Sequence, residues 1–291
     1  MKFTIVGSLG NIGKPLTQKL ISEGHEVTVI TSSIERQTEI EQLGANAAIG
    51  SVNDAQFLEK TFKGADAVFS MTPPNMGGSN IIINTTNAGK ALASAIQKSG
   101  IKRVVMLSSI GADLPNGTGP IQALHNIESV FNELKDVAIT YLRAGYFYTN
   151  FYASVPMIKN MGILGGNMQN TTLLPLVHPT DIAVAVAEEL QKIATENNIR
   201  YIISDIKTPE ELATIIGSAI NKPLLWTSFT DEQNLNGMLQ AGVPVEISEL
   251  YTEMGRALRN GIIQNDFVLS GSPVYGSVKA EEFAKEFANQ F

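Results

Sequence analysis

The feature that most constrains this chain is a glycine-rich stretch near its amino terminus. A run at 3–6 that is rich in β-branched residues leads into glycines spaced G-x-x-G-x-x-G, at Gly7, Gly10 and Gly13, and an amphipathic stretch follows. This order predicts a strand, a tight loop and a helix over 14–23. Unpaired amides at the beginning of such a helix, with the positive end of the helix dipole, attract a phosphate group. The stretch therefore predicts a dinucleotide-phosphate site.

Each glycine of this loop has its own predicted role. Gly7 lets the backbone turn sharply out of the strand, and Gly10 removes a Cβ where a pyrophosphate approaches. Gly13 lets the helix pack close to the strand. The residues of the loop predicted to contact the cofactor are Gly7, Leu9, Gly10, Asn11, Ile12 and Gly13.

The composition excludes several classes of protein. The chain has no cysteine, which rules out disulfides, thiolate catalysis and cysteine-bound zinc, and we expect no metal site. A net charge of −7 without a basic cluster argues against binding to nucleic acid. Lys2 is followed at once by the first strand, which leaves no room for a signal peptide, and no apolar run approaches the ~20 residues of a membrane span. We therefore expect a cytoplasmic protein that contacts neither nucleic acid nor membrane.

Beyond the loop, strands and helices alternate as a parallel α/β sheet requires. Further strands are predicted at 27–30, 45–49, 65–71, 101–109, 137–143 and 200–204. The second of these leads to Asn53, which we expect to cap the next helix, and a longer helix is predicted at 81–99.

The character of the chain changes at Thr208, where a capping box with proline at the first helical position opens a helix through Ile220. A strand at 223–229 and helices near 231–241, 246–260 and 277–289 complete a smaller lobe, with Phe283 and Phe287 as its anchor. The prediction is a doubly wound parallel Rossmann sheet with a smaller, mostly helical C-terminal lobe. The first domain is predicted to comprise 1–150 plus about 173–206, and the second 151–172 plus 207–291.

The glycine spacing differs from the G-x-G-x-x-G of most dehydrogenases and resembles that of the short-chain dehydrogenase/reductase superfamily. Three segments narrow the resemblance to the atypical, NmrA-like branch of this superfamily. They are the strand that ends in Ser108 and Ser109, the strand that ends in Arg143, and the segment 173–183. The resemblance covers essentially the whole chain, most strongly over 1–150 and more weakly after 206. It implies an NAD(P)-binding Rossmann fold and reductase-like function.

The tip of the second strand indicates which cofactor is bound. In the family a carboxylate there holds the ribose hydroxyls of NAD, whereas hydroxyls and an arginine accept the 2′-phosphate of NADP. No acidic residue stands before Glu35, and the tip offers Thr31, Ser32, Ser33 and Arg36. NADP(H) is therefore favoured over NAD, and the alternative is a solvated loop with a chance arginine.

Two further loops are predicted to contact the cofactor. Ser51 and Val52 follow the third strand, at the place where relatives carry an aspartate against the adenine. Thr72 and Pro73 stand at the carboxyl end of the fourth strand, where open α/β sheets bind ligands, so we expect them under the ribose and nicotinamide. The glycine-rich loop 75–80 is expected to be mobile.

The catalytic residues of the family are missing. One of the paired serines, here Ser108, normally orients a substrate carbonyl beside a Tyr-x-x-x-Lys pair, but the corresponding positions hold Pro120 with Leu124 or Ile121 with His125. Ser108 and His125 remain the weak catalytic candidates, the histidine as a substitute for the lysine or simply as a partly exposed helix residue. Ser108 is also predicted to contact the cofactor.

An aromatic cluster at 146–152 suggests a substrate pocket. We expect Tyr146, Phe147 and Tyr148 to line an apolar pocket over the nicotinamide, or alternatively to pack between the lobes. The loop 162–172, rich in glycine and asparagine, suggests a flexible lid. Asp181 follows His178 closely, but family precedent makes Asp181 a structural helix cap.

Two functions follow from these observations. One is an NADPH-dependent oxidoreductase that lacks the usual Tyr-x-x-x-Lys pair and reduces a small apolar carbonyl, enone or quinone. The other is a non-catalytic NADP(H) redox sensor that acts through a regulatory protein partner, as the vacant catalytic positions would allow.

Overall fold

The computed structural model describes residues 1–73 and 79–291, which form two compact units. The first unit comprises 1–109, 123–143 and 182–200, and the second 110–122, 144–181 and 201–291. The two units alternate along the sequence, as expected, but the first unit contains fewer residues than the first domain expected from the sequence. Residues 144–150 and 173–181 belong to the second unit because they contribute strands to a separate small sheet.

The first unit is built around a seven-stranded sheet of order β10-β6-β5-β4-β1-β2-β3. Its strands are β1 (Lys2–Val6), β2 (Glu26–Thr31), β3 (Asn46–Ile49), β4 (Ala67–Ser70), β5 (Arg103–Ser109), β6 (Ala138–Ala144) and β10 (Asn198–Ile202). β1 pairs in parallel with β2 and β4, β2 with β3, and β4 with β5. The strand order reverses at β1, which is the doubly wound arrangement, and the predicted fold class is confirmed.

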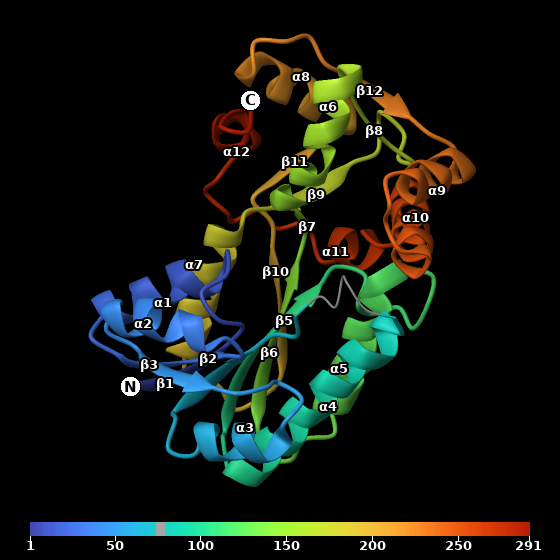
Figure 1. The fold of residues 1–291 in the computed structure, drawn as a ribbon. Helices are drawn as coiled ribbons and strands as arrows, with labels where there is room; N and C mark the ends of the chain where they lie inside the picture. The colour runs from blue at the N-terminus through green and yellow to red at the C-terminus, as the bar shows by residue number, and fades with distance from the viewer. Residues whose placement is uncertain (74–78) are drawn as a thin grey trace. The chain divides into compact units, whose positions relative to one another are not determined.

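Helices cover both faces of this sheet, as Figure 1 shows, with α1 and α7 on one face and α3, α4 and α5 on the other. Their bounds are α1 (Gly13–Ser22), α2 (Gln37–Gln42), α3 (Ala55–Phe62), α4 (Ile81–Ser99), α5 (Gln122–Phe131) and α7 (Pro179–Leu190). Buried residues of α3, α4 and α5, among them Phe62, Leu92 and Phe131, form one apolar cluster with sheet residues such as Val104. Because helices cover both faces of the sheet, the strands show little alternation.

One local prediction needs correction, and one helix was missed. Asp54, and not Asn53, caps α3, because its carboxylate accepts the backbone N–H groups of Gln56 and Phe57. The six-residue helix α2 was not predicted, because only one of its residues, Ile40, is buried and so no apolar stripe marks it.

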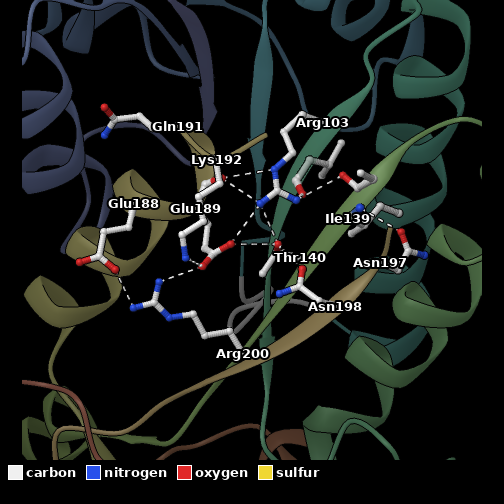
Figure 2. Close-up of polar contacts among 12 residues, drawn as sticks. Arg103, Ile139, Thr140, Glu188, Glu189, Gln191, Lys192, Asn197, Asn198 and Arg200 are labelled. Atoms are coloured by element: carbon white, nitrogen blue, oxygen red, sulfur yellow. Dashed lines mark hydrogen bonds and ion pairs between the residues drawn. The ribbon is translucent and has the colours of Figure 1, made fainter. Parts of the chain in front are cut away.

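A buried ionic network fastens α7 to the sheet (Figure 2). The carboxylate of Glu189 lies 3.2 Å from Arg103 Nη2, 2.9 Å from Arg200 Nη1 and 2.6 Å from Lys192 Nζ. Arg103 also donates to the hydroxyl of Thr140 at 2.8 Å. Burial raises the pKa of Glu189, but the hydrogen bonds and charges of Lys192 and Arg200 more than offset it, so that the pKa lies below its ordinary value. Glu189 is therefore ionised in the folded protein at neutral pH.

The second unit combines two small sheets with helices. A three-stranded sheet has the order β11-β9-β7, and β12 pairs in parallel with β8. The strands are β7 (Tyr146–Phe147), β8 (Ile163–Gly166), β9 (Leu174–Val177), β11 (Asp205–Lys207) and β12 (Leu225–Ser228). The helices are α6 (Val155–Met161), α8 (Pro209–Ala219), α9 (Asp231–Gln240), α10 (Val245–Arg259), α11 (Asn265–Leu269) and α12 (Ala280–Ala288), with short 3-10 turns η2 (Gly119–Ile121) and η3 (Tyr148–Ser154). The capping box predicted at Thr208 is present.

The segment 162–172 is not the flexible lid that its composition suggested. β8 forms within it, and Asn167, only 4% exposed, donates to Asp231 at 2.9 Å and to the carbonyl of Thr252 at 2.8 Å. A Cβ on Gly165 would lie 2.8 Å from the ring of Phe229. Gly165 therefore permits close packing rather than motion, and the prediction of a lid was wrong.

The expected anchor of the carboxyl terminus is confirmed. Phe283 and Phe287 on α12 are fully buried. Tyr148 stacks on Phe283 with ring centroids 4.8 Å apart, and Tyr152 stacks on Phe287 at 5.5 Å. Within the described ranges, 1–73 and 79–291, we find no helix that combines the length and the apolar character needed to cross a membrane.

Candidate functional site: the glycine loop and its neighbours

Two glycines of the loop are required by the fold itself. Gly7 has φ +119°, a conformation that disfavours other residues, and a Cβ there would lie 2.5 Å from the sulfur of Met71. A Cβ on Gly13 would overlap the carbonyl oxygen of Ser8. These contacts agree with the predicted sharp turn and the predicted close packing of the helix on the strand.

Gly10 is different, because none of the described residues requires a glycine there. Its φ lies outside the left-handed region, and the nearest atom to a Cβ would be the carbonyl oxygen of Gly7 at 3.8 Å, an ordinary van der Waals distance. Gly10 and its neighbour Asn11 are exposed. Because Gly10 has no side chain, its exposed backbone surface, which we call the cradle, is open, as the approach of a pyrophosphate would require.

The amino end of α1 faces this cradle without a side-chain cap. Ile12 stands at the N-cap position, and no side chain of the described residues makes a capping hydrogen bond there. Leu9 and Ile12 are each 5% exposed and hold the loop against the core. The helix thus offers amide donors and a positive dipole end beside Gly10.

The tip of β2 is joined to the same loop. The hydroxyl of Thr31 accepts hydrogen bonds from Ser8 Oγ at 3.1 Å and from the backbone N–H of Ser33 at 3.2 Å. Arg36 donates through Nη1 to the carbonyl of Leu9 at 3.4 Å. The predicted phosphate-binding loop and the predicted selectivity residues are therefore adjacent.

Arg36 is available for a further contact. Its side chain is 48% exposed, and its nearest carboxylate, that of Glu39, is 3.9 Å away. Lys14 lies closer to Glu39, with Nζ 2.9 Å from Oε1. Lys14 thus pairs with the carboxylate nearest to Arg36, which weakens the repulsion of an anion that approaches Arg36.

A hollow of about 560 Å³ lies between the loops that follow β3 and β4 and the beginning of α4. Val52 and Pro73, both predicted to contact the cofactor, line it. Sequence reasoning missed the remaining lining residues, which are Asn53, Asn84, Thr85, Asn87 and Ala88. The polar run 84–87 in an otherwise apolar first half of the helix was the signal that could have identified them.

Ser51 and Thr72 flank this hollow in sequence but do not line it. The hydroxyl of Ser51 accepts the backbone N–H of Asn53 at 3.2 Å and so closes a turn. Thr72 is half-buried just beyond β4. Most of the loop predicted to be mobile at 75–80 lies outside the described residues.

Ser108, one of the two weak catalytic candidates, makes a buried structural contact. Its side chain is buried, and its hydroxyl donates to Glu128 Oε1 at 2.5 Å. The same carboxylate is held by Arg143, with Nη2 to Oε2 at 2.7 Å and Nε to Oε1 at 3.2 Å. Since this buried ion pair uses the serine as a donor, Ser108 links β5 to α5. His125, the other candidate, lies half-buried in α5.

The three aromatic residues predicted to line one pocket do not share a cavity. Tyr146 lines a cavity of about 120 Å³ in the second unit, together with Phe151 and Tyr251. Tyr148 instead stacks on Phe283 in the packing of α12, within the second unit and not between the lobes, and Phe147 is half-buried on β7 without lining that cavity. Burial and the neighbouring Tyr251 raise the pKa of Tyr146 to about 12, so its hydroxyl keeps its proton at neutral pH.

His178 and Asp181 do not form a catalytic pair. Asp181 accepts hydrogen bonds from Ser204 Oγ at 2.6 Å, from Ser277 and from the N–H of Val278 at 3.1 Å. Its role is structural, as expected, but it holds the segment before α12 instead of capping α7. His178 Nδ1 itself accepts the N–H of Thr180 at the beginning of that helix, at 3.3 Å.

Comparison with known proteins places the chain in a family. The NmrA-like family model matches residues 1–274. The chain belongs to this family. An NAD(P)H azoreductase of Xenophilus azovorans is 22% identical over 260 residues, which cover 86% of this chain and 85% of the relative.

Two solved structures resemble this NmrA-like protein over nearly its whole length. One is an NADPH-dependent quinone oxidoreductase of Escherichia coli complexed with NADPH, with a TM-score of 0.84 at 16% identity, covering 98% of this chain and 99% of that one. The other is the triphenylmethane reductase of a Citrobacter species complexed with NADP(H), with a TM-score of 0.79 at 19% identity and the same coverage. At these identities the likeness shows a shared fold.

The residues of the first unit fit a dinucleotide. A Cβ would fill the cradle at Gly10, which the fold leaves open, and amide donors and Arg36 stand beside it. Among residues 1–73 and 79–291 no cluster of three or more histidine or carboxylate side chains could hold a metal ion.

Proposed function

We propose that this NmrA-like protein is an NADPH-dependent reductase of small apolar conjugated acceptors, foremost quinones, and related enones or carbonyls. The observation that carries the proposal is the cradle at Gly10 beside Arg36. A glycine that the fold does not need, next to a half-exposed arginine, fits a pyrophosphate followed by a ribose that carries a 2′-phosphate.

The residues that would hold the cofactor follow from the geometry. The backbone amides of Gly10, Asn11, Ile12 and Gly13 would bind the pyrophosphate. Thr31, Ser32, Ser33 and Arg36 would bind the ribose and its 2′-phosphate, and the hollow between Val52 and Pro73 would receive the adenine. Thr72, at the carboxyl end of β4, would stand near the nicotinamide half. When bound, NADPH supplies a hydride to the acceptor.

The missing acid determines which acceptors are favoured. The positions of the usual tyrosine and lysine hold no such residues, and the hydroxyl of Ser108 donates to Glu128. A reduction whose transition state requires a proton from an enzyme side chain is therefore expected to be slow. Quinones need less acid assistance than simple ketones. The named activities of the relatives, on quinones, azo compounds and triphenylmethane dyes, support a conjugated acceptor.

The test is a titration with NADPH followed by an assay of its oxidation against quinones, enones, aldehydes and simple ketones. We expect NADPH to bind more tightly than NADH and quinones to be reduced faster than ketones. His125→Ala should weaken NADPH binding more than it slows turnover at saturation, because the histidine would act through ribose positioning. Equal rates for quinones and ketones would contradict the role assigned to the missing acid.

The vacant catalytic positions also favour a second candidate, a non-catalytic NADP(H) sensor. If NADPH binds at micromolar concentration while no acceptor in the panel oxidises it, the reductase proposal fails. A set of captured protein partners that changes between NADP and NADPH would then support the sensor.

A further inference from the structure

The second unit contains a cavity that the proposed cofactor site does not use. It has a volume of about 400 Å³, within the range of pockets that bind small molecules. The cross-strand pair Pro175 and Ile206, from β9 and β11, contributes to its lining. The end of α10 and the short helix α11 supply Leu258, Phe267 and Val268. Most of the lining is therefore apolar.

Two lining residues carry polar atoms whose hydrogen bonding is incomplete. Thr172 and Gln264 are 8% and 7% exposed. Among the described residues, the Thr172 hydroxyl and Gln264 Oε1 have no hydrogen-bond partner. Two hydrogen bonds fix the orientation of the Gln264 amide, because its Nε2 donates to the carbonyls of Leu173 and Leu258 at 3.0 and 2.9 Å. The unpaired atom is thus an acceptor. A buried acceptor without a donor is costly in a native structure.

The charge at the cavity is already neutralised. Arg259 lines it, but its guanidinium makes a two-point contact with Asp231, at 3.0 and 3.3 Å, and donates to the carbonyl of Asn167 at 2.8 Å. An anionic ligand would find no unpaired positive charge in this arginine. A neutral ligand is therefore favoured.

We propose that this cavity is a binding site for a small neutral aromatic molecule that carries one hydroxyl group. The ring system would replace water on Pro175, Ile206, Phe267 and Val268. A small displacement of the Gln264 side chain, whose Oε1 is buried in the unliganded protein, would let the ligand hydroxyl donate to that atom. The site requires neither NADPH nor turnover, so the proposal stands or falls independently of the proposed reductase activity.

The experiment uses 2-naphthol as the probe and 2-methoxynaphthalene, which lacks the donor, as its matched control. Binding is measured without cofactor by the shifts of the methyl NMR signals of Leu173 and Val268. We expect 2-naphthol to bind about tenfold more tightly than the methoxy compound, as one hydrogen bond to a buried acceptor allows. Equal binding of the two compounds, or no binding of 2-naphthol up to its solubility limit, would overturn the proposal.

Two variants locate the site on the protein. Val268 lines the cavity and is 58% exposed, so Val268→Trp should fill the cavity mouth without disturbing the core and should weaken 2-naphthol binding at least tenfold. Leu269, on the same short helix and 78% exposed, does not line the cavity, and Leu269→Trp should bind like the wild type. For these variants the shift of the Leu173 methyl signals reports binding. Unchanged affinity in Val268→Trp, or equal loss in both variants, would place the probe elsewhere and refute the assignment.

Discussion

Replacement of Gly10 by alanine separates the requirements of the fold from those of the cofactor. Among the described residues, the atom nearest to the new Cβ would be the carbonyl oxygen of Gly7 at 3.8 Å, so none of them obstructs it. A glycine-to-alanine change at a permissive backbone position alters the free energy of unfolding by only about 0.4–1 kcal/mol, usually in the stabilising direction. Gly10→Ala should therefore be as stable as the wild type.

Binding of NADPH should respond very differently. The methyl group would occupy the surface that the pyrophosphate approaches and would displace it from one or two backbone donors. Each hydrogen bond to a charged group contributes roughly 1.5–3 kcal/mol. The loss of one such bond corresponds to about a tenfold to hundredfold rise in Kd, since every 1.4 kcal/mol is about tenfold.

Gly13→Ala provides the contrast. Its Cβ would overlap the carbonyl oxygen of Ser8, so this variant should lose both thermal stability and cofactor affinity. The assays are thermal unfolding without ligand and fluorescence titration with NADPH. The reasoning is refuted if Gly10→Ala keeps wild-type affinity, or if it loses as much stability as Gly13→Ala.

Three further predictions test the cofactor preference and the packing of each unit. Arg36→Ala should weaken NADPH binding about tenfold or more while NADH binding barely changes, and titrations that show an equal loss for both would contradict the 2′-phosphate contact. Glu189→Gln leaves Arg103 buried without its counter-charge and should lower the free energy of unfolding by about 3–5 kcal/mol in urea at pH 7. Because the folded-state pKa of Glu189 is lowered, this stabilisation is present above the ordinary pKa of 4.5 and is lost as the pH falls below that value. If the wild type and Glu189→Gln differed in unfolding free energy by the same amount at pH 7 and at pH 3, the argument would be refuted. Phe283→Ala removes the ring that stacks on Tyr148 and should cost about 3–5 kcal/mol of unfolding free energy, whereas a loss under about 1 kcal/mol would show that α12 is not an anchor.

Much of the architecture is local information and could be predicted from the sequence. The glycine spacing, the seven strands and the capping box at Thr208 each depend on residues within a few positions of one another. Helix 81–99 was predicted with the bounds that the structure shows. Periodicity and backbone preference act over such short distances, so a single sequence expresses them directly.

The roles of individual side chains depended on contacts between distant parts of the chain. Ser108 is held by Glu128, twenty residues away, and Asp181 accepts hydrogen bonds from Ser277, 96 residues away. Tyr146 and Tyr148, two positions apart, face a cavity and the packing of α12 respectively.

By itself the sequence determined the glycine loop, the order of the seven strands of the main sheet and the hydroxyl-rich tip with its arginine, because these are set by local spacing. Only the tertiary structure decided that no described residue crowds a Cβ at Gly10, that Arg36 lies beside Leu9, and that Asn84 and Asn87 join Val52 around one hollow. The physical reason is that a side chain's neighbours are chosen by how helices and strands pack against each other, and packing unites residues that no pattern along the chain connects.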